Sequence, residues 1–123
     1  MKISLVRYLE SNLERLAAEI TERMEEERPE LFERYRARSL GKGRDPAEWC
    51  KEDTVFHLRH LAAALDSNDP TEFREYRSWL VRMLGARGIP EEDIDANFDA
   101  MADALTGRLG EGAGPAVSML SVR

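Results

Sequence analysis

The sequence predicts an all-α fold, and three observations lead to it. Apolar residues recur at spacings of three and four along most of the chain, as they do on one face of an α-helix. Most of the five prolines and eight glycines fall between such stretches rather than inside them. No stretch alternates apolar and polar residues strongly enough to indicate a β-strand. We expect a bundle of about five helices in a single domain at residues 1–106. A glycine-rich, flexible tail at residues 107–123, with at most one helical turn, is expected to follow.

The first two predicted helices meet at Pro29. The earlier one spans residues 3–27, and its apolar stripe consists of Leu5, Leu9, Leu13, Leu16, Ile20 and Met24. Proline suits the first position of a helix, so a second, short helix is expected over residues 29–40. That helix carries Leu31, Phe32 and Tyr35 on one side. Residues 41–44 then form a loop that contains two glycines.

Two Asp-Pro pairs mark the starts of the next helices. Asp45 and Asp69 can each accept a hydrogen bond from a first-turn backbone N–H, and the proline after each is pre-set for the first turn. These signals predict one helix at residues 46–66 and another that begins at Pro70. Gly88 is the expected left-handed end of the latter, and Pro90 opens the last clear helix.

Composition and charge exclude several function classes. The 123 residues carry a net charge of −6 and no compact basic block, so nucleic acid is not an expected partner. No apolar run approaches the roughly 20 residues that a membrane span requires. The N-terminal residues lead directly into charged ones, so no secretory signal is expected. With a single cysteine, the chain fits a reducing, cytoplasmic setting.

The residues that most often carry chemistry give little support for a metal site or an enzyme. His57 and His60 are three residues apart, whereas metal-binding pairs on a helix prefer a spacing of four. No histidine follows His60, so ordinary haem ligation is not expected either. Cys50 and His57 lie two helical turns apart, about 10 Å, which is too far for the imidazole to activate the thiol.

The helix predicted at residues 46–66 is the most informative segment. One of its faces combines a thiol, a carboxylate and an imidazole with apolar residues: Cys50, Asp53, Thr54, His57, Leu61, Ala64 and Leu65. A buried carboxylate needs partners, because an unpaired buried charge is costly. Asp53 is therefore a candidate ligand-binding residue. The alternative is that Asp53 lies at the rim of the core and has no special role.

Residues 50–65, CKEDTVFHLRHLAAAL, resemble the chromophore helix of the phycobiliproteins. That helix has a cysteine, Arg-Asp at the second and third positions after it, a pair that is often Tyr-Tyr at the sixth and seventh, and then Leu-Arg. Other segments resemble the family in the same order along the chain. Residues 27–32 resemble its Gln-Pro-Gln-Leu segment, Asp69 falls at its Gly-Asp turn, and residues 84–90 resemble its Leu-Gly-Val/Thr-Pro turn. The likeness covers roughly residues 11–105.

The resemblance implies a globin-like, phycobilisome-type bundle that lacks a full final helix. It also implies binding of a linear tetrapyrrole (bilin) such as phycocyanobilin or biliverdin. The chain resembles a short, non-antenna relative, such as the bilin biosynthesis-associated globins of non-photosynthetic bacteria, more than a light-harvesting subunit, so it would act as a carrier, a biosynthesis helper or a light sensor. Bilin-biosynthetic enzymes are then possible partners. A homodimer is expected through the helices that flank Arg59, which matches an interface arginine of the family.

The resemblance assigns roles to residues by position. Cys50 occupies the position that forms a thioether to the bilin, and Asp53 matches the carboxylate that accepts hydrogen bonds from the central pyrrole nitrogens. Phe56 and His57 occupy the positions of the aromatic pair that packs on the rings.

The contact to the bilin propionate differs from the family pattern. Glu52 stands where the family has an arginine that pairs with a propionate. Lys51 and Arg44 are the basic residues that we expect to replace that contact.

A second function class stays open at this point. Similar helical segments precede cobalamin-binding domains in some bacterial sensors. In that case the chain would be a cofactor-free helical regulatory or dimerisation module, with its pocket filled by its own side chains.

Overall fold

The computed structural model describes residues 2–39 and 45–122, and these residues confirm the all-α prediction. No strand occurs among them. The helices in chain order are α1 (Lys2–Ser11), α2 (Leu13–Glu27), α3 (Pro29–Ser39), α4 (Pro46–Ser67), α5 (Pro70–Ala86), α6 (Glu91–Leu109), a 3₁₀ turn (Gly110–Ala113) and α7 (Gly114–Leu120). No helix in the described part of the chain is long and apolar enough to cross a membrane.

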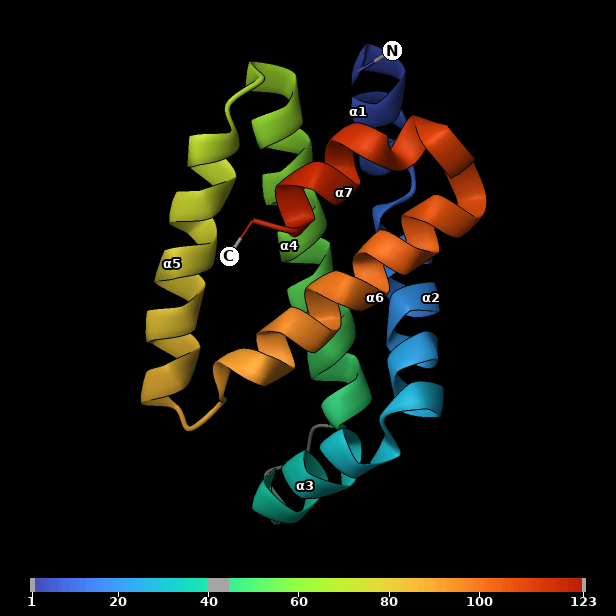
Figure 1. Cartoon of the computed structure of the whole chain (residues 1–123). Helices are drawn as coiled ribbons and strands as arrows, with labels where there is room; N and C mark the ends of the chain where they lie inside the picture. The colour runs from blue at the N-terminus through green and yellow to red at the C-terminus, as the bar shows by residue number, and fades with distance from the viewer. Residues whose placement is uncertain (1, 40–44, 123) are drawn as a thin grey trace.

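Helix α4 is the centre of the bundle (Figure 1). Helices α1 and α2 pack along one side of it, α5 packs along the other, and α6 crosses diagonally over α2 and α4. Helix α3 lies against the N-terminal end of α4. The side chains that α4 contributes to the core include Leu58, Leu61, Ala62, Ala64 and Leu65, none of which is more than 1% exposed.

The predicted helix at residues 3–27 is two helices, α1 and α2, with a break at Asn12. The Asn12 backbone leaves the helical region (φ −128°, ψ 21°), and its side-chain Nδ2 donates to the carbonyl of Tyr8 at 2.8 Å. Asparagine side chains compete in this way with the helical backbone hydrogen bonds. The apolar stripe survives the break, because Leu9 and Leu16 on either side of it are fully buried.

The predicted helix starts are confirmed in detail. An Oδ1 atom of Asp45 accepts from the backbone N–H of Ala47, and an Oδ1 atom of Asp69 accepts from that of Thr71, both at 3.0 Å. Helix α4 ends at Asn68, which adopts the left-handed conformation that ends many helices. These local signals fix where α4 lies along the chain, and α4 carries most of the residues that the sequence singles out.

The prediction that residues 107–123 contain at most one helical turn is wrong for the described residues, which end at Val122. Helix α6 continues to Leu109, the chain turns at Gly110 with a positive φ of 56°, and α7 follows. Two alanines of this region are fully buried, and Met119 and Leu120 are nearly so. Because α7 packs on α6, α4 and α5, its order comes from burial rather than from a long stripe of its own.

Candidate functional site

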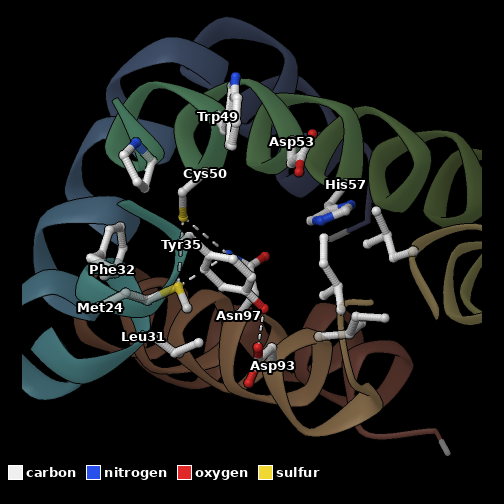
Figure 2. Close-up of a pocket in the computed structure, with 14 residues that line it drawn as sticks. Met24, Leu31, Phe32, Tyr35, Trp49, Cys50, Asp53, His57, Asp93 and Asn97 are labelled. Atoms are coloured by element: carbon white, nitrogen blue, oxygen red, sulfur yellow. Dashed lines mark hydrogen bonds between the residues drawn. The ribbon is translucent and has the colours of Figure 1, made fainter. Parts of the chain in front are cut away.

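A cavity of about 150 Å³ lies beside the N-terminal half of α4 (Figure 2). We call it the ring pocket. Its walls come from α2, α3, α4, the end of α5 and the first turns of α6, and most of its lining side chains are apolar. The residues that line it include Met24, Phe32, Tyr35, Trp49, Cys50, Asp53, His57, Leu84, Asp93, Ile94 and Asn97.

Side-chain bonds tie α3 to the start of α6 at the edge of the ring pocket. The hydroxyl of Tyr35 donates a short hydrogen bond to the Asp93 carboxylate, and Nη2 of Arg34 lies 3.3 Å from both oxygens of the same carboxylate. Asp93 stands in the first turn of α6, where the helix dipole favours a negative charge. This contact holds α3 over the pocket as one of its walls.

Cys50 lines the ring pocket, as the resemblance implies for a bilin-attaching thiol. Its Sγ lies 3.8 Å from Sδ of Met24 and 3.6 Å from Nδ2 of Asn97. Burial raises the pKa of the Cys50 thiol, so the thiolate that acts as a nucleophile is scarce at neutral pH. The thiol therefore forms part of the wall without being activated.

Asp53 lies at the rim of the pocket and is exposed, not buried in the core-facing stripe of α4. It also borders a second hollow of about 280 Å³ between α4 and α5, which we call the aromatic hollow. The ring pocket and the aromatic hollow share three lining residues, Asp53, His57 and Leu84. The carboxylate therefore stands where the two hollows meet.

His57 is buried between the two hollows and has a protein partner. Its Nδ1 lies 2.6 Å from the hydroxyl of Tyr76, and its ring contacts that of Phe98 at a centroid distance of 5.3 Å. Burial lowers the pKa of His57 to about 3, so the ring is neutral. Its Nδ1 can therefore accept a hydrogen bond from the Tyr76 hydroxyl. Burial, and then the charge of Asp53, raise the pKa of Tyr76, which keeps its proton.

Aromatic side chains surround the aromatic hollow. His60 stacks on Tyr76 with ring centroids 3.9 Å apart, and Trp79 lies beside Tyr76 at 6.0 Å. Phe56 borders this hollow, not the ring pocket, and more than half of its surface is exposed.

Of the two predicted propionate contacts, only Lys51 belongs to the described residues. Lys51 lies on the other side of α4, where its Nζ is 3.7 Å from Oε2 of Glu14, and it borders neither hollow. Lys51 is not placed to make the predicted contact, because it directly follows Cys50 and therefore projects from a different face of α4, where it meets Glu14 of α2. Arg44 lies outside the described residues.

Asn97, a buried polar residue of α6 that was not predicted from the sequence, also lines the ring pocket. Its side-chain Nδ2 contacts Met24 and Thr54, while its Oδ1 is buried without a hydrogen-bond partner among the described residues. A signal for it exists in the sequence. Asn97 follows Ile94 by three residues and precedes Phe98 and Met101, so it belongs to the core-facing stripe of α6.

Comparisons add no identification. The chain matches no protein-family model, no curated protein and no solved structure with which it was compared. Within the described residues, no group of three or more histidine, cysteine or acidic side chains is arranged to hold a metal ion. The chemistry of the site therefore rests on its own geometry.

Proposed function

We propose that the chain binds a linear tetrapyrrole along the groove that the ring pocket and the aromatic hollow form together. The observation that carries this proposal is the position of Asp53, whose carboxylate stands where the two hollows meet. A carboxylate beside several pyrrole N–H groups accepts their hydrogen bonds and favours the protonated, cationic form of the bilin.

The dimensions of the groove limit how such a ligand fits. The ring pocket, at about 150 Å³, is smaller than the roughly 300–1,000 Å³ of most sites for extended organic ligands. It has room for one ring, so the remaining rings would lie across Asp53 and along the aromatic hollow. There Tyr76 and Trp79 offer aromatic surfaces to the bilin rings.

The charges and the thiol favour non-covalent binding with the propionates in solvent. Among the residues that the structure describes, no lysine or arginine lines the ring pocket or the aromatic hollow. Because the pKa of the Cys50 thiol is raised, this side chain is a poor nucleophile at neutral pH. We therefore propose that the colour of a bilin complex does not depend on a thioether to Cys50, and that Cys50→Ala retains it.

The substitution Asp53→Asn tests the proposed function. We expect wild-type protein to bind biliverdin, and Asp53→Asn to lower the pKa of the bound biliverdin by about 1–3 units, because the nearby negative charge is lost. The measurement is an absorbance titration of the complex against pH. Helical circular dichroism should not change, since Asp53 is exposed.

Glu52→Gln is the matched control for that titration. Glu52 is the adjacent exposed carboxylate and borders neither hollow, so its removal should leave the biliverdin pKa in place. A wild-type protein that takes up no biliverdin refutes tetrapyrrole binding. Equal pKa values in Asp53→Asn and Glu52→Gln refute the counter-ion role of Asp53.

A second candidate function is an interaction module, and the exposed aromatic residues favour it. Phe56 and Trp79 are 54% and 49% exposed, and both border the aromatic hollow. Exposed aromatic surface of this kind is typical of protein interfaces. Under this proposal the hollow receives a side chain from a partner, and the simplest partner is a second copy of the chain.

Sedimentation equilibrium tests whether the aromatic hollow is a dimer interface, as the interaction module requires. The interaction module predicts a wild-type homodimer that Trp79→Glu converts to a monomer, because a charge would be buried in the interface. Glu75→Gln, at an exposed position of the same helix, should leave the dimer intact. A wild-type monomer at all concentrations, together with biliverdin uptake, contradicts the module and leaves the tetrapyrrole proposal standing.

A further inference from the structure

The ring pocket contains a buried hydrogen-bond acceptor that no described protein group satisfies. Asn97 is 7% exposed, and its Oδ1 has no hydrogen-bond partner among the described residues. Asn97 lines the ring pocket, and Figure 2 shows its side chain among the residues that surround the cavity. Buried polar atoms are nearly always paired, and a bound ligand or water molecule supplies the partner where the protein does not. Oδ1 of Asn97 is therefore a candidate contact for a donor bound in the ring pocket.

The hydrogen-bond network favours one orientation of the Asn97 amide. Nδ2 lies 3.1 Å from Sδ of Met24 and 3.2 Å from Oγ1 of Thr54. The thioether has no hydrogen to donate, and the Thr54 hydroxyl already donates to the carbonyl of Cys50 at 2.7 Å. Turning the amide over would place Oδ1 against these two acceptors and beside Sγ of Cys50, whose S–H is only a weak donor. The oxygen therefore belongs on the side without protein partners.

The size and lining of the pocket restrict what can carry that donor. A cavity of about 150 Å³ with apolar walls takes up a molecule the size of one aromatic ring. Phe32, Leu84 and Ile94 supply apolar surface. An N–H or O–H group on the ring would complete the hydrogen bonding of Asn97.

We infer that the ring pocket is a subsite for a single five- or six-membered aromatic ring whose N–H or O–H donates to Oδ1 of Asn97. This inference builds on the proposed function, under which the ring is an end ring of the tetrapyrrole. Asn97 thereby selects donor-bearing rings over apolar rings of the same size.

Pyrrole and thiophene test the inference directly, because the two rings are similar in size and only pyrrole carries an N–H donor. Titration of each into ¹⁵N-labelled protein, followed by NMR chemical shifts, gives the two dissociation constants. We expect wild-type protein to bind pyrrole about tenfold more tightly than thiophene, the effect of leaving one buried acceptor unpaired. In Asn97→Leu, which has a similar volume and no acceptor, the two constants should become nearly equal.

Asn12→Ala is the control for a general loss of stability. It removes the hydrogen bond from Asn12 to the carbonyl of Tyr8, and Asn12 does not line the ring pocket. This variant should keep the preference for pyrrole. Circular dichroism of both variants checks that each is folded.

The possible results separate this inference from the proposed function. Equal binding of pyrrole and thiophene by wild-type protein, or binding of neither, overturns the subsite whether or not biliverdin is taken up. A preference that persists in Asn97→Leu overturns the role of Asn97 and indicates that another acceptor, such as the Asp53 or Asp93 carboxylate, accepts the hydrogen bond from the pyrrole N–H. A preference for pyrrole that Asn97→Leu abolishes, without any uptake of biliverdin, supports the subsite and refutes tetrapyrrole binding.

Discussion

Acidification from about pH 7.5 to pH 5 is expected to lower the free energy of unfolding by about 2 kcal/mol through His57 alone. Burial holds the pKa of His57 at about 3 in the folded protein, against 6.5 for an ordinary histidine. Below pH 6.5 the unfolded chain therefore binds a proton that the folded protein does not bind. The stabilisation is fully present above pH 6.5 and is lost as the pH falls towards 3, where the loss approaches ~5 kcal/mol.

Urea unfolding at the two pH values measures this effect. His57→Gln keeps an acceptor for the Tyr76 hydroxyl and does not titrate, so its stability should fall by about 2 kcal/mol less than that of wild type. His60→Gln is the control on the same helix. Desolvation also lowers the pKa of His60, but most of this side chain stays in solvent. The variant His60→Gln should therefore keep most of the pH dependence of wild-type stability. If His57→Gln and wild type lose the same free energy of unfolding between the two pH values, the buried neutral ring of His57 does not cause the pH dependence.

Leu120→Ala is expected to lower the free energy of unfolding by about 2–5 kcal/mol, the usual cost of truncating a buried leucine. Leu120 is 1% exposed and belongs to α7, the helix that the sequence analysis did not predict. Ser118→Ala, at an exposed position of the same helix, should change stability by no more than about 0.5 kcal/mol.

Thermal or urea unfolding of the two variants measures how firmly α7 is docked. A large difference between Leu120→Ala and Ser118→Ala shows that α7 is part of the cooperative core. If both substitutions change the free energy of unfolding by the same small amount, α7 is not firmly docked and behaves as the flexible tail predicted from the sequence.

The parts of the fold that local chemistry decides could be predicted from the sequence. Asp45 and Asp69 cap the helices that they were predicted to cap, because the signal and the bond lie within two residues of each other. The break at Asn12 depends on competition between one side chain and the backbone, which an apolar stripe does not reveal. Helix α7 has only seven residues, too few for a repeating apolar stripe to be recognised, so the surface against which it packs explains its order.

The candidate site was predictable to the extent that it lies on one helix. Cys50, Asp53 and His57 share a face of α4, and helical periodicity places them together. Tyr35 and Asn97 reach the ring pocket from α3 and α6, and the packing of those helices cannot be inferred from periodicity alone. The same periodicity places Lys51 on a different face of α4 from Cys50, so its position away from the ring pocket could also have been predicted.

The positions of the two tryptophans give each half of the proposed groove, the ring pocket and the aromatic hollow, its own natural fluorophore. Trp49 lines the ring pocket, and Trp79 borders the aromatic hollow with about half of its surface in water. The chain has no other tryptophan, so replacing either residue with phenylalanine leaves a single emitter in a known half. Quenching or a wavelength shift in each single-tryptophan protein then reports occupancy of one half without a chemical label.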